Sequence, residues 1–311
     1  MLFFIIRRIG VMVLMMVIST FAVFSMVNLE PNLRKLALEQ NNNRMSTEEV
    51  DRWLEKNGYR RPLVVRYGEW LGNTAAGDFG YSTRFRKPVN DVMPVRLGYT
   101  GILAFWVMII MVPAALLIGV LAGMREGSKL DRVLSTASIT STATPEYVSG
   151  ILFTVIFATW LGWLKGVAKA GDVTFENFTL PVLTMAIYGI GYIARMTRAS
   201  MAEVMTSQYI RTARLKGLSF SSIVIKHALR NALIAPFTVI MLQFPWLLTG
   251  VVIVEKLFNY KGFGFLLIEA ADNNDIDLLL SCSIVSVAVV MVTQLISDIG
   301  YVYLNPRIRI K

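Results

Sequence analysis

Long stretches without a charged residue constrain this chain more than any other feature of its sequence. Five are wholly uncharged, at residues 9–27, 97–124, 178–194, 231–254 and 278–297, and a sixth, at residues 133–164, holds a single charge. A helix needs about 20 mostly apolar residues to cross the roughly 30 Å hydrocarbon core of a bilayer. Within the six stretches the only charged residue is Glu146, in the third. The sequence therefore predicts an all-α integral membrane protein with six transmembrane helices.

The overall composition supports this fold class and excludes several functions. Hydrophobic residues make up 55% of the chain and charged residues 17%, whereas soluble domains carry about 25% charged residues. A soluble enzyme or a nucleic-acid-binding protein is therefore disfavoured. The chain has one cysteine and one histidine, which cannot form a His/Cys metal cluster, so we predict no metal site.

The distribution of basic residues predicts the orientation in the membrane. If the N-terminus is cytoplasmic, the inner segments hold 15 Lys and Arg residues and the two short outer loops hold 4. Cytoplasmic loops carry an excess of Lys and Arg. We therefore expect a multi-pass membrane protein with both termini in the cytoplasm. The net charge of +10 then reflects topology rather than nucleic-acid binding.

The predicted spans divide the chain into four parts. Residues 1–28 form the N-terminal cytoplasmic end and the first helix, and residues 29–96 form an external subdomain inserted between helices 1 and 2. Residues 97–304 form a core of five transmembrane helices, which includes a cytoplasmic loop at residues 203–230. Residues 305–311 form a cytoplasmic tail. In the external subdomain, Ser46 followed by two acids predicts a helix that ends near Gly58, and residues 62–71 predict a second one.

Motifs that carry chemistry are missing from the sequence. It has no G-x-x-x-x-G-K-[ST] phosphate loop, no G-x-S-x-G and no H-E-x-x-H. We therefore predict no catalytic residue and no binding of ATP through a phosphate loop in this chain. A G-x-x-x-G pattern at Gly119 and Gly123 indicates close packing of a spanning helix against a neighbour.

The inner segment between the fourth and fifth spans is the most informative part. Ile210, Ala213 and Gly217 are spaced to lie on one face of a helix, and the two small residues would let a partner backbone approach that face. Leu218 follows as an apolar residue at a turn. Two interpretations remain open: a docking element for a cytoplasmic partner, or an amphipathic helix lying on anionic lipid.

On the outer side, the loop at residues 255–277 contains a turn rich in glycine and aromatic residues. Tyr260, Gly262, Phe263 and Gly264 would suit a closely packed external gate. A solvated loop explains the same residues equally well.

Glu146 would lie near mid-bilayer if the third stretch were one helix. A carboxylate there is costly, so it would face a cavity or a partner rather than lipid. We predict that Glu146, Pro145 and Gln243 line a translocation path. The alternative is that residues 133–144 run along the inner surface and place Glu146 among lipid headgroups.

Several strings of this sequence resemble one family. Residues 211–217 (RTARLKG) and 227–232 (HALRNA) are similar to the EAA loop of ATP-binding-cassette (ABC) importer permeases. Residues 77–82 (GDFGYS), 192–201 (YIARMTRASM), 258–264 (FNYKGFG) and 305–309 (NPRIR) resemble further motifs of its dipeptide/oligopeptide/nickel branch, first-permease (B-type) subunit. Arg211 stands where the generic loop has Glu, as it often does in the peptide branch.

The resemblance implies the type I ABC-importer permease fold, a location in the bacterial cytoplasmic (inner) membrane and a set of partners. These are a homologous second permease, two ATPase subunits at the cytoplasmic face and an extracytoplasmic substrate-binding protein. The chain itself would hold no cofactor and would not be an enzyme, because ATP and Mg are used by the ATPase subunits. The residues implied to couple the permease to the ATPase are Ile210, Arg211, Thr212, Ala213, Arg214, Lys216, Gly217 and Leu218.

The substrate implied by the resemblance is a short peptide, an oligosaccharide or nickel. Two other classes compete with a permease. A secondary transporter or channel would show inverted repeats or several intramembrane charges, and a membrane enzyme would need paired acids, a metal set or a nucleophile. The sequence shows neither pattern.

Overall fold

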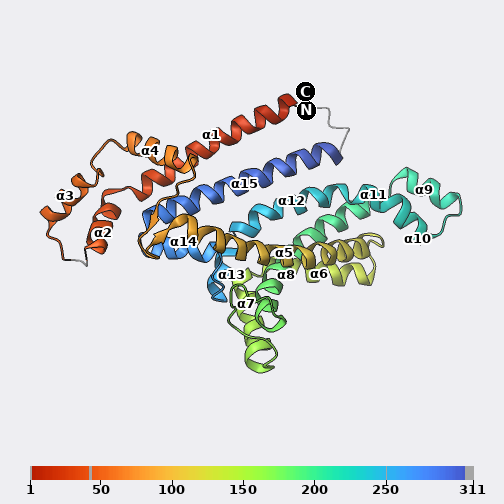
Figure 1. Cartoon of the computed structure of the whole chain (residues 1–311). Helices are drawn as coiled ribbons and strands as arrows, with labels where there is room; N and C mark the ends of the chain where they lie inside the picture. The colour runs from red at the N-terminus through yellow and green to blue at the C-terminus, as the bar shows by residue number, and fades with distance from the viewer. Residues whose placement is uncertain (1, 42–43, 250, 305–311) are drawn as a thin grey trace. The chain divides into compact units, whose positions relative to one another are not determined.

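The computed structural model describes residues 2–41, 44–249 and 251–304, and most of these are helical (Figure 1). The elements up to residue 123 are α1 (Leu2–Val27), α2 (Glu30–Gln40), α3 (Thr47–Lys56), α4 (Leu63–Ala75), β1 (Tyr81–Ser82), β2 (Lys87–Pro88) and α5 (Val89–Gly123). Those that follow are α6 (Lys129–Ala143), α7 (Glu146–Phe153), the π-helix η1 (Thr154–Trp160), α8 (Phe175–Met205), α9 (Gln208–Leu215), α10 (Phe220–Ser222), the π-helix η2 (Ile223–Ala228), α11 (Leu229–Ala232), α12 (Ile234–Thr249), α13 (Val251–Leu257), α14 (Phe263–Asp272) and α15 (Ile276–Leu304).

Several helices are long and apolar enough to cross a membrane. Within the described residues, four helices meet that test: Ile6–Val27, Val89–Gly123, Phe175–Met205 and Ile276–Gly300. A fifth span is possible if Phe220–Ala232 and Ile234–Leu247, which are bent by 50°, act as one. The prediction of an all-α chain with several apolar helices is confirmed, but the count of six spans is not.

The third predicted span is not one helix. It is broken between α6 and α7, where Thr144 adopts an extended conformation before Pro145. The ring of a proline disfavours helical geometry in the preceding residue, and proline has no N–H to continue the helix. The stretch at residues 133–164 is therefore two helices separated at Pro145, and the apolar helix that remains, Glu146–Trp160, is shorter than a usual span.

The chain divides into two compact units, each of which has its own apolar core. The first comprises residues 1–100 and 261–291, and the second comprises residues 101–260 and 292–311. Helices α5 and α15 therefore contribute residues to both. These units are defined by how the residues pack. The predicted division of the chain into cytoplasmic, membrane-spanning and external parts is a separate matter and remains a prediction.

In the first unit, α1 packs against α4 through aromatic residues. Phe24 and Tyr67 make an edge-to-face contact with ring centroids 5.5 Å apart, and the Tyr67 hydroxyl donates to the carbonyl of Val17 at 3.0 Å. A second core cluster joins the start of α5 to α14 and α15, and it includes Met93, Phe263 and Cys282. Between α4 and α5, β1 and β2 pair antiparallel with Ser82 opposite Lys87.

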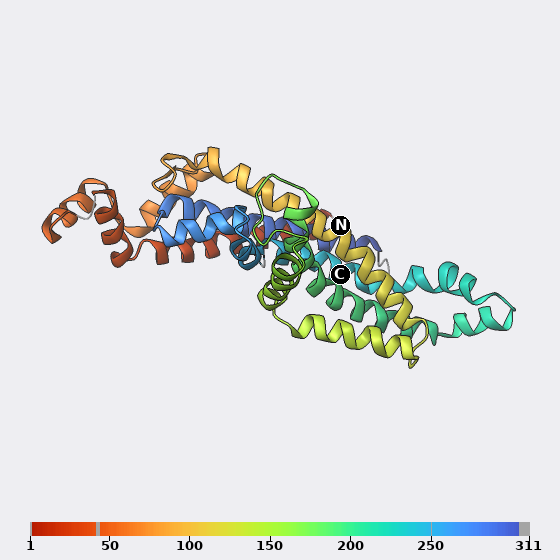
Figure 2. The same ribbon diagram turned by 90° about the horizontal axis from the view of Figure 1, so that it is seen from below.

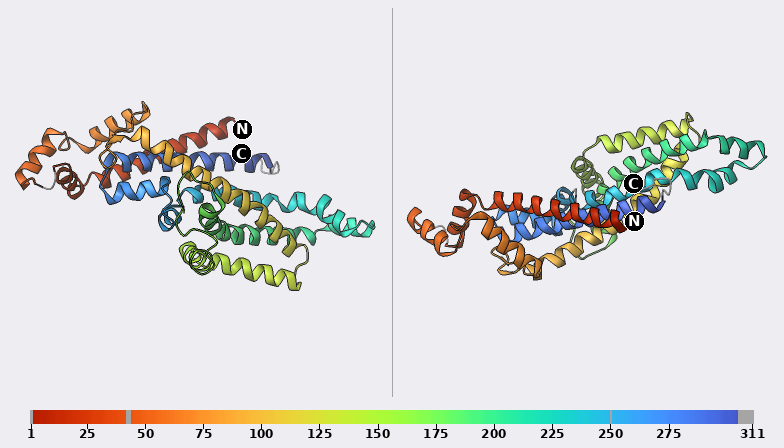
Figure 3. Two further views of the ribbon diagram at one scale, coloured as in Figure 1. Left: turned by 60° about the horizontal axis from the view of Figure 1, so that its bottom comes forward. Right: turned by 90° about the horizontal axis from the view of Figure 1, so that it is seen from above.

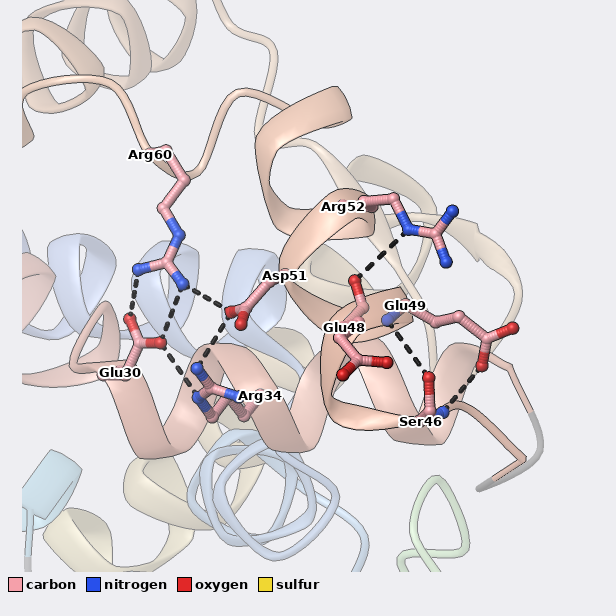
Figure 4. Close-up of polar contacts among 8 residues, drawn as sticks. All are labelled: Glu30, Arg34, Ser46, Glu48, Glu49, Asp51, Arg52 and Arg60. Carbon is pink, nitrogen blue, oxygen red and sulfur yellow. Dashed lines mark hydrogen bonds and ion pairs between the residues drawn. The ribbon is translucent and has the colours of Figure 1, made fainter.

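Helix α3 begins where the sequence predicts. The Ser46 hydroxyl accepts a hydrogen bond from the Glu49 N–H, and the Glu49 carboxylate accepts one from the Ser46 N–H (Figure 4). This capping box satisfies two donors that the first turn leaves free. Gly58 follows the helix with φ +77°, a conformation that favours glycine.

Helix α2 was not predicted, and an ion-pair network joins it to α3. Arg60 donates to both carboxylate oxygens of Glu30, at 3.0 and 3.1 Å, and to Asp51 at 2.6 Å (Figure 4). Arg34 donates to the same two acids, at 2.9 Å and 2.8 Å. These groups are all exposed or half-exposed, so a single pair contributes little, but the shared network fixes how α2 and α3 lie together.

In the second unit, α8 is the central helix. The antiparallel neighbour α6 runs along it (Figures 2 and 3), and α7, α12 and α13 also pack against it. Glycines allow the close approach. A side chain at Gly191 would overlap the Ser141 hydroxyl at 2.0 Å, and one at Gly119 would lie 2.4 Å from Thr197 Cβ. The close packing predicted for the G-x-x-x-G pattern is therefore present, with α8 as the neighbour.

Candidate functional site: coupling segment and path residues

The segment from α9 to α11 is held together by its own buried core. It lies at the end of the second unit away from α7 (Figures 1 and 2). Ile210 and Ala213 on α9 point into a cluster with Met201 and Met205 at the end of α8 and with Ile223 on η2. Ile210 is fully buried. This core attaches the segment to α8.

The face that carries Ile210 and Ala213 is therefore not free in this chain, and the coupling role of residues 210–218 stays a prediction. The 3.6-residue pattern does mark the apolar side of α9, but that side packs onto the chain itself. The surface left free is different: Leu215 is 81% exposed and Leu218 is 40% exposed. The other predicted coupling residues are also exposed: Arg211, Thr212, Arg214, Lys216 and Gly217.

Gly217 ends α9 through its backbone rather than through its small size. Its φ is +75°, and no atom lies within 4 Å of the position of a Cβ. Glycine is the common residue for such a left-handed position after a helix, because it has no Cβ to clash. The chain turns here, and the Ser219 hydroxyl then accepts from the Ser222 N–H to begin α10.

Two further contacts hold the segment. The Asn231 side-chain amide donates to the Tyr209 hydroxyl at 2.9 Å, which joins α11 to α9. The Arg125 guanidinium lies over the Phe220 ring at 5.3 Å, so the loop after α5 contacts the start of α10. The segment is thus held at both ends, with Leu215 and Leu218 projecting from it.

An ion pair between a buried carboxylate and a half-buried arginine joins α6 to α8 and was not predicted. Arg198 on α8 donates from Nε and Nη2 to the two carboxylate oxygens of Asp131, both at 2.8 Å. The Asp131 carboxylate also accepts from the Gly127 N–H at 2.9 Å and the Ser135 hydroxyl at 3.0 Å. The hydrogen bonds from the Arg198 guanidinium are the main reason why the pKa of Asp131 lies well below its usual range. The pair fixes the start of α6 to α8, and a capping serine before an acid was the only sequence signal for it.

The predicted path residues lie close to an aromatic pair. Glu146 opens α7, directly after Pro145, and its carboxylate accepts a hydrogen bond from the Trp246 indole on α12. The Trp246 ring stacks on Tyr188 of α8, with centroids 5.4 Å apart. Gln243 lies one turn before Trp246 and is buried. Glu146 and Gln243 are thus on facing elements of one unit, while their role in transport remains a prediction.

The turn that the sequence predicts on the outer side is buried rather than solvated. Tyr260 is fully buried, and its ring meets Phe178 edge to face with centroids 5.7 Å apart. Phe263 is also buried, and its N–H donates to the Thr100 hydroxyl at 2.7 Å. Gly262 and Gly264 are buried with it, at the start of α14. A freely solvated loop is excluded, and a gate role remains a prediction.

Comparisons with known proteins identify the family. The family described as "Binding-protein-dependent transport system inner membrane component" matches residues 115–310. The chain is 32% identical over 273 residues to the oligopeptide transport system permease protein AppB of Bacillus subtilis (strain 168), which covers 85% of this chain and 86% of that protein.

Glutathione transport system permease proteins GsiC are similarly related. The protein of Salmonella choleraesuis (strain SC-B67) is 35% identical over 254 residues, and that of Escherichia coli (strain K12) is 34% identical over the same length, with 82% of each chain covered. The apolar helices agree with the inner-membrane location in the family description. The prediction from the sequence motifs is confirmed: this chain belongs to the family of binding-protein-dependent transport system inner membrane components, the permeases of ABC importers.

Proposed function

We propose that this chain forms half of the translocation path of an ATP-driven importer of short peptides. A homologous permease would form the other half, and two ATPase subunits would bind the cytoplasmic face and use ATP and Mg. A binding protein on the outer side would deliver the substrate. Peptides are favoured over oligosaccharides or nickel because the relatives named above carry oligopeptides or glutathione by their names.

The observation that carries the proposal is the exposed end of α9. Leu215 and Leu218 project from a segment whose opposite side is packed onto α8. Exposed leucines surrounded by Arg211, Arg214 and Lys216 suit a groove on a protein partner that combines an apolar floor with acidic edges. Because Met201 and Met205 of α8 lie in the same core as Ile210, a displacement of α9 would pull on α8.

The test compares the same Leu→Arg substitution at two exposed leucines that lie in different parts of the protein. Leu215→Arg should leave the permease folded but prevent co-purification of the ATPase subunits and abolish ATP-driven peptide uptake. Burial of such a leucine in an interface contributes about 2 kcal/mol, or roughly a 30-fold change in affinity. Leu130→Arg, at a half-exposed leucine on α6, serves as the control and should have little effect. Normal ATPase recruitment by Leu215→Arg would contradict the proposed docking surface.

The proposed orientation places both termini in the cytoplasm and α2 to α4 outside. Single cysteines at the exposed positions Glu48 and Ser221 can be labelled in intact cells with a membrane-impermeant maleimide. Cys282 can stay, because its thiol is fully buried. Labelling at Glu48 alone supports the orientation, and labelling at Ser221 alone contradicts it.

The substrate class is tested on the binding protein. The purified cognate protein should bind dipeptides and glutathione in equilibrium titrations, with nickel ion and maltotriose as the competing classes. Tight binding of nickel or maltotriose without peptide binding would reject a peptide importer and leave the permease assignment intact.

A further inference from the structure

The first unit contains a cavity of about 260 Å³ that the transport proposal does not use. It lies between the end of α1, the turn after α3, α4, the chain before β1 and the start of α15. Four aromatic side chains line it: Phe24, Tyr59, Trp70 and Phe79. Its volume is below the roughly 300–1,000 Å³ of sites for drug-sized ligands, so a smaller molecule fits.

One wall of the cavity carries an arginine without a carboxylate partner. Nη1 of Arg66 donates to the Tyr59 carbonyl at 3.1 Å, and Nη2 donates to the Asn28 side chain. The guanidinium also lies 4.9 Å from the centre of the Tyr59 ring. No ion pair joins it to an acid in the ranges that the structure describes. Burial lowers the pKa of Arg66 from its ordinary value, but a guanidinium keeps its charge in proteins.

A second arginine in the cavity, unlike Arg66, is already paired with an acid. Arg61 lines the same cavity but forms two parallel bonds to Glu69, at 2.8 and 2.7 Å. Its charge is already neutralised. Arg66 is therefore the cation of this cavity that has donor capacity for a ligand.

Another wall carries an unpaired carboxylate. Asp277, in the first turn of α15, accepts a hydrogen bond on Oδ2 from the Tyr81 N–H at 3.2 Å. Its Oδ1 accepts none from the described residues, and none of their basic groups forms an ion pair with it. The helix N-terminus stabilises this charge in part. Asp78, which is more exposed, adds a second acid to the lining.

We propose that this cavity binds a small zwitterion, a free amino acid or short peptide, with its carboxylate at Arg66 and its ammonium group at Asp277. A ligand with both charges satisfies both walls by charge-assisted hydrogen bonds, which are the stronger kind. An anion alone would meet the repulsion of Asp277 and Asp78, and a cation alone would meet that of Arg66. The aromatic walls would contact the remainder of the ligand.

This inference deepens the proposed function and rests on it for the choice of peptides. The same two charges occur in phosphoethanolamine, the headgroup of a common lipid. The experiment therefore separates a peptide from a headgroup.

Binding is measured on the full permease complex in phosphatidylglycerol nanodiscs, without the binding protein or nucleotide. The probe is radiolabelled dialanine, with N-acetyl-dialanine, dialanine amide and phosphoethanolamine as competitors. We expect dialanine to bind, and each analogue lacking one charge to compete at least tenfold more weakly. Direct binding of radiolabelled phosphoethanolamine, with no binding of dialanine, would overturn the peptide assignment.

Variants locate the site. Arg66→Gln and Asp277→Asn should each weaken dialanine binding at least tenfold. Asn73→Trp removes no side-chain contact seen in the structure, but the new side chain should fill the cavity and block binding. This variant therefore tests the site even if Arg66→Gln does not fold. Arg52→Gln, at an exposed arginine outside the cavity, should bind as the wild type does. Unchanged binding in Asn73→Trp and Asp277→Asn would refute the site.

Uptake by the complete system separates the two proposals. ATP-driven dialanine uptake without cavity binding would refute this inference and leave the proposed function standing. Cavity binding of dialanine without any peptide uptake would refute the proposed substrate and leave the site standing.

Discussion

Substitution of the glycines that join α5 to α8 should destabilise the protein strongly. In Gly119→Ala the new methyl group would lie 2.4 Å from Thr197 Cβ and 2.6 Å from the Ala194 carbonyl oxygen. In Gly123→Ala it would lie 2.5 Å from the Arg198 carbonyl oxygen. Backbone atoms cannot rotate away, so the two helices must separate.

The magnitude follows from two opposing terms. Alanine in place of glycine stabilises a helix by roughly 0.5–1 kcal/mol. Overpacking of a close contact costs typically 1–3 kcal/mol. We expect each variant to lose about 1–2 kcal/mol of its free energy of unfolding. Gly101→Ala is the matched control on the same helix, because nothing lies within 4 Å of its Cβ position, and it should gain up to about 1 kcal/mol.

The assay is reversible unfolding in mixed micelles with increasing SDS, followed by helical circular dichroism. The ordering of the three variants decides the outcome. If Gly119→Ala and Gly123→Ala unfold at the same SDS fraction as Gly101→Ala, the close packing of α5 on α8 is refuted.

Three further predictions concern single side chains. Asp131→Asn should lose about 3 kcal/mol in the same assay, because it leaves Arg198 without its anion. Since the folded pKa of Asp131 lies below its ordinary value near 4, this stability should be complete above about pH 5 and decline as the pH falls, so the gap in stability between the wild type and Asp131→Asn should narrow steadily at low pH. Ser46→Ala should lower the hydrogen-exchange protection of the first turn of α3 by about 1 kcal/mol, and unchanged protection would contradict the cap. Glu146→Gln, at matched protein levels, should reduce peptide uptake, because it removes the negative charge of the predicted path while keeping an acceptor for Trp246; full uptake would remove Glu146 from the path.

Local signals in the sequence predicted individual elements well. The Ser46 cap and Gly58 marked both ends of α3, because capping and left-handed geometry depend on few neighbouring residues. Helix α2 was missed, since its sequence is polar with Pro31 in the first turn, and its ion pairs reach Asp51 and Arg60 far along the chain. Such distant partners leave no periodic pattern.

Hydropathy predicted apolar segments but not where they break. A window average does not register one proline, and Pro145 therefore separates α6 from α7 within a stretch that looks continuous. The tail motif at residues 305–309 lies outside the described residues, so the structure does not bear on it.

At the candidate coupling segment, the spacing of apolar residues predicted which side of α9 is apolar, but not what that side packs against. Ile210 and Ala213 show the spacing of an interface helix, and a buried helix of the same chain has the same spacing. Burial of Ile210 decides between them. The Asp131–Arg198 pair and the Arg66 cavity were missed because each depends on side chains brought together from distant parts of the chain.

The proposed coupling depends on α8 more than on α9 itself. Helix α8 runs unbroken from Phe175 to Met205, although Pro181 in its second turn cannot donate the usual hydrogen bond to the Asn177 carbonyl. Its last turns share a core with α9, while Tyr188 in its first half stacks on Trp246, the partner of Glu146. A rigid helix transmits a displacement at one end to the other, whereas a hinge would absorb it. The ion pair at Arg198 fixes α6 to the same helix between these two regions. A movement imposed on α9 would therefore reach the carboxylate and aromatic residues of the predicted path through one continuous helix.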